Sequence, residues 1–581
     1  MAGSGEPRTR KDTLSLVDRS TSEIAHEDGK ASRAQVVGTT SLYENGQVRL
    51  IPAPSPDPRE PLNPPQWRKW AAIGSLCFFG SLALSAEIIV GSLVPLYLLF
   101  SSGVDVRILN TVDFRTISGG SATGVNPFAI IPQGVIPADI EKVSMLATIP
   151  LLSNGIASYF LVPLSIAIGR RPGLFLAGAC AWVGGFLAAA SSSLDVHLVA
   201  RAMQGLGAGT VEALIPLILQ DMVFIHQRNK AMAVVVSSQG IVIPALGIVT
   251  PYIASVYDWR WVYYITSSFG IVAWLLLVAF LPETRWTRSK EELSGQRLHP
   301  VEPGETRPKV DYERYPAPTQ WSYLGLFQNG FAWKQAGMSM FNTLRTTPFP
   351  AIVWATVANG IFMIVNSAAQ QIGSVALLAQ GWQFQYTGVF AVPFIAATGL
   401  VYFFGGPVAD RISNAVARRN GGAREPEHHL LNVVLPLVSG LTGMFVFGWA
   451  GQTNAHWAFL MLGSFLVIFG SLVVLSVINV FLVESYPMWA GPVLVDVSSL
   501  RIIIGFFVSS KSTSWIAERG FLNTFIIYAE VMIVVSLGIP LLYFFGRKLR
   551  QWTAGMVQKI TSGDSTEKEV DDSVSEESLR P

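Results

Sequence analysis

Charged residues are scarce in this chain. Asp, Glu, Lys and Arg together make up 14% of its 581 residues, whereas hydrophobic residues make up 50%. A soluble globular protein carries roughly 25% charged residues. The low charge accompanies repeated apolar runs of about 20 residues or more, which are long enough to cross a bilayer. The composition therefore excludes an ordinary soluble domain and indicates a lipid bilayer as the surroundings of most of the chain.

Cysteine is scarcer still. The two cysteines, Cys77 and Cys180, each lie inside a hydrophobic run, which excludes a disulfide framework and a cysteine-based zinc site. The sequence also lacks a P-loop, a nucleophile elbow and a kinase signature. We therefore expect neither an enzyme nor a bound cofactor or metal. A net charge of +2 without any nucleic-acid motif makes nucleic acid an unexpected partner.

The polar segments at both ends are predicted to be tails. Residues 1–69 lack the compact apolar segment of a signal peptide. They are rich in Pro, Ser, Arg and Glu, so we expect a disordered cytoplasmic tail. Residues 547–581 are predicted to form a second cytoplasmic tail. The polar segment 101–139 is predicted to be a long outer loop.

The apolar runs fall into two sets of six, which predicts an all-α integral membrane protein. Residues 70–285 hold the first set and residues 349–546 the second. The charged, Pro-rich residues 286–348 form a central cytoplasmic loop, in which 324–344 are expected to form an interfacial amphipathic helix. The expected spans are 70–100, 143–168, 172–190, 197–222, 231–256, 262–281, 352–378, 387–405, 430–450, 456–483, 493–516 and 522–545.

The positive charges set the predicted orientation. With the N-terminus inside, most Lys and Arg residues between the spans lie on the cytoplasmic side. The other side then carries mainly Arg107, Arg115, Arg260 and Arg519. Both termini are therefore expected to be cytoplasmic.

The first and fourth spans carry charge at depth. Arg201 and Glu212 share one helical stripe with Gly205 and Ala208, and charges inside a membrane face a protein interior or a wet cavity. About 16 Å of helix separates the arginine from the glutamate, which excludes direct pairing. Glu87 in the first span is the expected partner. Alternatively, Arg201 extends to the outer interface, and both glutamates are neutral packing residues.

Polar side chains also lie at depth in the second set of spans. They are Asn366 and Gln370 in the seventh span, Asn479 in the tenth and Glu530 in the twelfth. We expect these four to line a substrate cavity, although amides also hold helices together by hydrogen bonds. Asp496 and Arg501 in the eleventh span are expected to belong to a salt-bridge network at the inner mouth.

Short charged turns recur at matching places in the two halves. Gly169-Arg170-Arg171-Pro172 ends the second span and Asp410-Arg411 ends the eighth. Cytoplasmic turns collect arginine in any case. The recurrence nevertheless suits a gate in which a carboxylate meets guanidinium groups in one conformation only. The predicted inner gate consists of Gly169, Arg170, Arg171, Asp221, Arg228, Asp410 and Arg411.

In combination, the motifs over about residues 62–553 resemble the major facilitator superfamily, and within it the fungal drug:proton antiporters with about twelve helices. The motifs that carry the resemblance are Leu62-Asn63-Pro64-Pro65-Gln66-Trp67, Gly169-Arg170-Arg171-Pro172, Arg201-x-x-Gln204-Gly205-x-Gly207-x-Gly209, Asp221 with His226-Gln227-Arg228, Asp258-Trp259-Arg260-Trp261, Pro282-Glu283-Thr284-Arg285, Asp410-Arg411, Asn420-Gly421-Gly422-x-Arg424-Glu425-Pro426-Glu427-His428 and Gly546-Arg547-Lys548-Leu549-Arg550.

The chain departs from the family pattern at two places. Ile166 and Ala167 stand where the family usually has Asp-Arg, so the latch of the first half is incomplete and its acidic member remains only as Asp410. In the fifth span, Thr250-Pro251 stands where antiporters carry a Gly-Pro pair.

The resemblance implies two six-helix bundles that move by alternating access around a site near mid-membrane. It implies export of a small, fairly apolar organic compound, such as a secondary metabolite, toxin or drug, by proton antiport. Glu87, Arg201 and Glu212 would couple protons. We expect a monomer in the plasma membrane, with a vacuolar or vesicle membrane as the alternative. The functional alternatives are a transporter for uptake of a nutrient or organic acid, and a membrane receptor or sensor that does not transport.

Overall fold

The computed structural model describes residues 52–103, 140–286, 331–419, 426–486 and 489–553, with short pieces between 43 and 50, at 109 and between 288 and 330. The chain divides into two compact units, of which the smaller comprises Met1–Pro56, Phe224–His226 and Thr287–Asp311. In the smaller unit, β1 (Tyr43–Glu44) and β2 (Gln47–Val48) pair antiparallel. The larger unit is helical.

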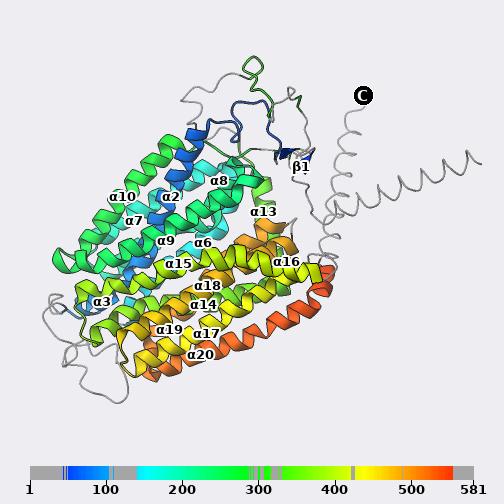
Figure 1. The fold of residues 1–581 in the computed structure, drawn as a ribbon. Helices are drawn as coiled ribbons and strands as arrows, with labels where there is room; N and C mark the ends of the chain where they lie inside the picture. Colours follow the sequence, from blue (N-terminus) through cyan, green and yellow to red (C-terminus); the bar gives the residue numbers. More distant parts are fainter. Residues whose placement is uncertain are drawn as a thin grey trace, which may run out of the picture. The chain divides into compact units, whose positions relative to one another are not determined.

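Twelve helical segments of the described chain are long and apolar enough to cross a membrane, and they lie side by side in the larger unit (Figure 1). Each coincides with a predicted span, so the all-α membrane fold is confirmed. The elements are α2 (Gln66–Ile88), η1 (Ile89–Leu93), α3 (Val94–Ser101), α6 (Ile140–Ile168), α7 (Arg170–Ala190), α8 (Leu194–Met222), α9 (Ile225–Val256), α10 (Trp259–Phe280), α13 (Trp333–Thr346), α14 (Pro350–Ala379), η2 (Phe384–Ala391), α15 (Val392–Phe403), η3 (Phe404–Val408), α16 (Ala409–Arg419), η4 (Pro426–Leu430), α17 (Leu431–Gln452), α18 (Trp457–Ser485), α19 (Ala490–Arg519) and α20 (Phe521–Ser536).

The first span is not one continuous α-helix, because its α-helical part ends directly after Glu87 and Ile88. The α-helix α2 ends at Ile88, and a 3-10 segment, η1, leads into α3. Glu87 therefore lies in the last turn of α2, where backbone carbonyls need partners from outside the helix.

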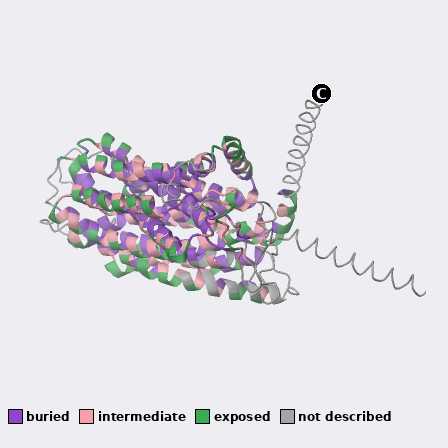
Figure 2. Cartoon of the chain, turned by 90° about the horizontal axis from the view of Figure 1, so that it is seen from above, coloured by how far each residue is buried: buried purple, intermediate pink, exposed green. Residues whose placement is uncertain are grey.

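Apolar side chains pack inside each half and also join the halves at one end. Figure 2 shows buried residues concentrated within the helical bundle. One buried cluster unites Leu93, Val143 and Tyr263 of the first half with Val375 and Phe384 of the second. This end of the bundle, which we predict to be the outer end, is therefore closed by packed side chains.

Glycines on α8 allow its neighbours to approach closely, as the Gly-x-Gly-x-Gly pattern predicts. A Cβ atom at Gly205 would lie 2.3 Å from the backbone oxygen of Pro150 on α6. A Cβ atom at Gly207 would lie 2.3 Å from the Cβ of Ala181 on α7. Small residues at such crossings bring backbones together in membrane bundles, and here they fix α8 between α6 and α7.

Two further expectations concern the connecting segments. The amphipathic helix expected over 324–344 is observed as α13, Trp333–Thr346. The outer loop 101–139 lies almost wholly outside the described residues, as do most residues of both tails. The division of the chain into tails, bundles and loops stays a prediction.

Candidate functional site

A cavity of about 680 Å³ lies between the two halves. Its walls come from the first span, α6, α8 and α9 on one side and from α14, α15, α18 and α19 on the other. Most of the residues that line it are apolar, including Phe362, Phe390 and Phe394. Among the described lining residues, the acidic ones are Glu87 and Glu212, and the one basic residue is Arg501. A mostly apolar cavity with a few placed polar groups is the usual form of a small-molecule site.

Glu87 presents a carboxylate that is only partly satisfied. Its side chain is 3% exposed, and its Oε2 accepts a hydrogen bond of 2.9 Å from Asn154 Nδ2 on α6. Oε1 is buried without a hydrogen-bond partner within the described chain. An unsatisfied buried carboxylate oxygen costs free energy, so such groups in native proteins call for a ligand, a proton or water.

Arg201 binds the backbone of the first span. Its guanidinium donates to the carbonyl oxygens of Ala86 at 2.5 Å, Glu87 at 2.9 Å and Leu146 at 3.1 Å. It also donates to Gln204 Oε1. The first two carbonyls belong to the last turn of α2, where a cation is favoured.

Two expectations about Arg201 are thereby corrected. The side chain is fully buried, so the alternative in which it extends to the outer interface is wrong. Its contact with Glu87 is to the backbone oxygen, and the carboxylate points to Asn154 instead. Arg201 does not line the cavity. It holds Glu87 in place through the main chain.

Glu212 and Arg501 form an ion pair across the cavity. Arg501 Nη2 on α19 lies 2.8 Å from Glu212 Oε2 on α8, so the pair joins the two halves. Asp496 and Arg501, which we expected in a salt-bridge network at the inner mouth, have separate partners. Arg501 pairs with Glu212, whereas Asp496 Oδ1 accepts from Thr347 Oγ1 at 3.1 Å.

The predicted amides do line the cavity. Asn366, Gln370 and Asn479 are all part of its wall. Asn366 Nδ2 donates to Ser471 Oγ at 2.8 Å, whereas its Oδ1 has no partner in the described chain. Asn359, also in the wall, has neither side-chain polar atom satisfied by a described residue. Polar atoms left open toward a cavity can bind a ligand.

Glu530 is the exception among the predicted cavity residues. Its side chain is exposed on α20 and is absent from the cavity wall. The prediction is wrong for this residue, because the polar residue of the twelfth span lies on the helix face turned away from the bundle.

A second ion pair joins the halves near the predicted outer end. Lys511 Nζ on α19 lies 2.6 Å from Glu141 Oε1 at the start of α6. Both side chains are nearly half exposed. Arg501 and Lys511 both lie on α19 and both pair with the first half, Arg501 with α8 in the cavity and Lys511 with α6 at the surface.

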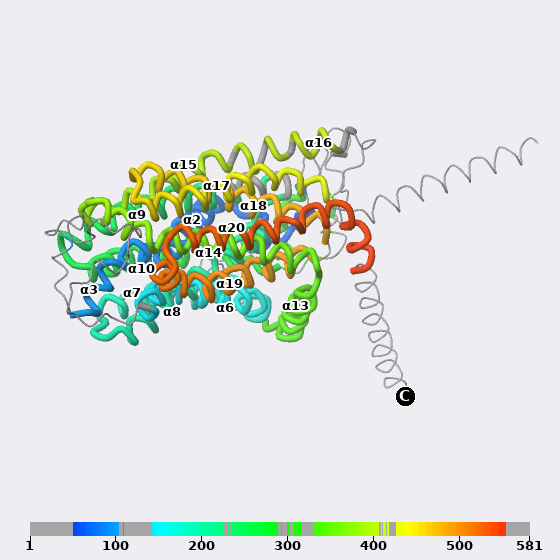
Figure 3. The backbone as a smooth tube through the Cα atoms, turned by 90° about the horizontal axis from the view of Figure 1, so that it is seen from below, coloured from blue at the N-terminus to red at the C-terminus, as the bar shows by residue number. Residues whose placement is uncertain are grey.

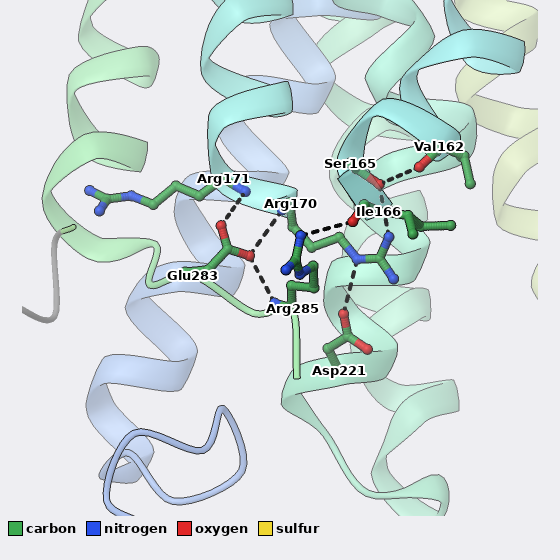
Figure 4. A network of polar contacts seen from close by, with 8 residues as sticks. All are labelled: Val162, Ser165, Ile166, Arg170, Arg171, Asp221, Glu283 and Arg285. Carbon is green, nitrogen blue, oxygen red and sulfur yellow. Dashed lines mark hydrogen bonds and ion pairs between the residues drawn. The ribbon is translucent and has the colours of Figure 1, made fainter. Parts of the chain in front are cut away.

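The turn at Gly169 is organised by Glu283, which sequence reasoning did not place in the inner gate (Figure 4). The Glu283 carboxylate accepts from the backbone N–H groups of Arg170 at 2.9 Å, Arg171 at 3.2 Å and Arg285 at 2.8 Å. Gly169 has a φ of +119°, and a Cβ there would lie 2.5 Å from Glu283 Oε2. The carboxylate thus caps the N-terminus of α7. The motif Pro282-Glu283-Thr284-Arg285 was the signal that could have found it.

Side-chain charges complete the turn at Gly169, which belongs to the predicted inner gate. Arg170 Nε lies 3.3 Å from Asp221 Oδ2 at the end of α8. Arg285 Nη1 donates to the carbonyls of Ile166 at 2.8 Å and Ala167 at 3.0 Å. Where the family usually has Asp-Arg, this chain holds the turn through its main chain.

The matching turn of the second half is described only in part. The side chains of Arg228 and Asp410 lie outside the described residues, and Arg411 is exposed. Nearby, Arg550 Nε and Nη2 donate to the two oxygens of Glu427, each at 2.8 Å. This bidentate pair joins two motifs that the sequence analysis singled out separately.

Comparison with known proteins agrees with this architecture. An uncharacterised MFS-type transporter of Schizosaccharomyces pombe is 21% identical over 88% of this chain and 90% of its own. The efflux pump radE of Floropilus chiversii is 24% identical over 85% of this chain and 83% of its own. The efflux pump vrtL of Penicillium aethiopicum is 24% identical over 60% of this chain and 67% of its own.

Solved structures share the fold. The xylose transporter XylE of E. coli, in a partially occluded inward-open conformation, superposes with a TM-score of 0.51 at 13% identity, over 81% of this chain and 97% of its own. The human organic anion transporter MFSD10 gives a TM-score of 0.51 at 15% identity, over 82% of this chain and 100% of its own. The sequence model of the Major Facilitator Superfamily matches residues 76–491. With twelve spans around a central cavity and a family match over most of its length, the chain is a multi-pass membrane protein that belongs to the major facilitator superfamily.

Proposed function

We propose that the chain exports a small, fairly apolar organic compound, such as a secondary metabolite, toxin or drug, from a fungal cell by proton antiport. The observation that carries the proposal is Glu87, whose Oε1 is buried without a described partner in the wall of a mostly apolar cavity between the halves. Two fungal relatives named as efflux pumps, each 24% identical, support the direction of transport.

Exchange requires a group for which substrate and proton compete. A substrate that donates a hydrogen bond, or that carries positive charge, binds to Glu87 while the Glu87 side chain is an ionised carboxylate. A proton on Glu87 removes that interaction, so each ligand lowers the affinity for the other. Alternate opening of the cavity to the two sides then converts proton entry into substrate release.

The other predicted residues have supporting roles in this scheme. Asn366, Gln370 and Asn479 contact the substrate from the second half. Arg201 positions Glu87, and the turn at Gly169 with Arg170 holds the inner gate. We place the transporter, as a monomer with both termini in the cytoplasm, in the plasma membrane; a vacuolar or vesicle membrane is the alternative.

Uptake of an organic acid is a second candidate, and Arg501 is the observation that favours it. Its Nε is buried without a described partner, and its Nη2 is held by Glu212. A substrate carboxylate would compete with Glu212 for this guanidinium. A proton on Glu212 would release Arg501, so proton and anion would bind together, which gives symport in place of antiport.

Transport into inside-out vesicles with an acidic interior tests the proposal. Vesicles from cells that express the wild type are expected to accumulate the lipophilic dyes rhodamine 6G (cationic) or Nile red (neutral) only while the pH gradient lasts. The Glu87→Gln variant should lose this response. Glu530→Gln is the matched control, because it makes the same change outside the cavity and should behave as the wild type.

The result also separates the two candidates. Accumulation that ignores the gradient, or a Glu87→Gln variant that responds like the wild type, would rule out antiport at this residue. Proton-driven accumulation of radiolabelled succinate in right-side-out vesicles, lost in Arg501→Gln, would establish uptake instead.

A further inference from the structure

Helix α13, in the loop between the halves, packs with its small residues inward and its large apolar residues outward. Ala336, Thr343 and Thr346 are buried against the bundle. Trp333 is 62% exposed, Phe341 52% and Leu344 55%. A helix in water shows the opposite arrangement, with its large apolar side chains toward the core. The exposed face of α13 therefore calls for an apolar environment.

The exposed face has two adjoining stripes. Trp333, Gly337, Phe341 and Leu344 recur at i, i+4, i+8 and i+11, and all four are exposed. Lys334 and Arg345 lie on the next stripe, where the Arg345 guanidinium is 5.0 Å from the centre of the Phe341 ring. Residues 333–346 include no Asp or Glu. An apolar stripe bordered by cations is the pattern of a helix that lies in a membrane interface.

Both ends of α13 are tied to the ends of membrane spans. Before the helix, Ala332 N–H donates to the Ala167 carbonyl at the end of α6, over 2.9 Å. After it, the chain enters α14 at Pro350, and Thr347 Oγ1 bonds Asp496 near the start of α19. In Figure 3, α13 lies beside α6 and α19 at this end of the bundle. These ties hold the helix at the depth where the spans leave the bilayer.

We propose that α13 is a membrane-surface helix, whose exposed face binds anionic lipid and which links the two halves at the inner end. Trp333, Phe341 and Leu344 enter the boundary between headgroups and acyl chains, while Lys334 and Arg345 reach the phosphates. The absence of carboxylates from α13 favours an anionic lipid surface over a protein partner. The proposal concerns the position of α13 and stands apart from the direction of transport and from its coupling ion.

The link has a mechanical consequence. The helix touches α6 of the first half and α19 of the second, so any rocking of the halves moves α13 along the lipid surface. Lipid that holds α13 should therefore influence how readily the inner end opens.

A depth measurement tests the proposal on the full chain. With Cys77 and Cys180 replaced by alanine, Phe341→Cys is labelled with an environment-sensitive dye and reconstituted in phosphatidylcholine with phosphatidylglycerol. Spin-labelled lipid is expected to quench this label severalfold more strongly than a label at Gln335→Cys, which is exposed at the edge of the same helix. Equal quenching at the two positions would overturn the proposal.

A second measurement avoids substitutions altogether. Hydrogen exchange of the wild type in nanodiscs is expected to slow in α13 when phosphatidylglycerol replaces part of the phosphatidylcholine, with no matching change in α17. Exchange in α13 that is the same in both lipids would overturn the role of anionic lipid. Protection that appears only with a co-purifying protein would assign this face to that protein instead.

Discussion

Glu212 and Arg501 meet across the cavity at 2.8 Å, although 289 residues separate them in the chain. Arg501 is nearly buried, whereas Glu212 is about one quarter exposed to the cavity. An ion pair in this position links α8 to α19, so it couples the two halves in the conformation described. Removing one partner leaves the other charge without compensation in a place where charge is costly.

The first prediction is that exchanging the charges of Glu212 and Arg501 restores part of the transport activity that either single substitution removes. Glu212→Gln and Arg501→Gln should each lower dye transport in inside-out vesicles by at least tenfold. The double exchange of Glu212→Arg with Arg501→Glu should recover a measurable part, because the pair can form in reverse. A double exchange no better than either single variant would show that the pair does not act as a unit.

The second prediction concerns Arg201 as a support for the first span. Arg201→Met leaves three backbone carbonyls unpaired, each at a cost of about 1–3 kcal/mol, so we expect a lower melting temperature in detergent and loss of transport. Arg201→Lys should recover little, because an ammonium cannot reproduce the planar guanidinium fork. Arg260→Lys, whose site near the predicted outer end is about one third exposed, is the control. If Arg201→Lys were as stable as the wild type, the guanidinium geometry would be irrelevant.

The third prediction tests the close helix crossing at Gly205. Gly205→Ala places a Cβ 2.3 Å from the Pro150 oxygen, and overpacking of this kind costs about 1–3 kcal/mol. Gly74→Ala is the matched control, since its Cβ would meet nothing within 4 Å. We expect the melting temperature to fall for the first variant and to stay unchanged for the second. A similar effect of both variants would mean that helix propensity, and not the crossing, decides the outcome.

The sequence could predict the spans and the depth of the charges, because both depend on local composition. Apolar runs mark each helix, and helical periodicity places Glu212 and Arg201 on one stripe whatever surrounds them. The Gly-x-Gly-x-Gly pattern likewise predicts close packing without naming the neighbour. These are properties of a single helix in a bilayer.

The partners of those charges could not be predicted in the same way. Glu212 meets Arg501 and Glu141 meets Lys511 because α19 lies against the first half, a relation set by tertiary packing of distant segments. Glu530 was misplaced for the same reason, since depth in a span does not reveal which face turns inward. Arg201 was expected to meet a carboxylate, whereas the break after α2 left carbonyls there that bind it more directly.

The last prediction uses the second ion pair to test alternate opening of the outer end. Glu141 and Lys511 lie on α6 and α19, and their nearly half-exposed side chains are within reach of thiol reagents once both are cysteines. In a chain with Cys77 and Cys180 replaced by alanine, a reducible cross-linker between Glu141→Cys and Lys511→Cys should abolish transport, because in the proposed export cycle the predicted outer end must part for substrate to leave. Reduction should restore the activity, and the same reagent on either single-cysteine variant should leave most of it. Transport that continues in the fully cross-linked protein would show that α6 and α19 stay together at this level throughout the cycle.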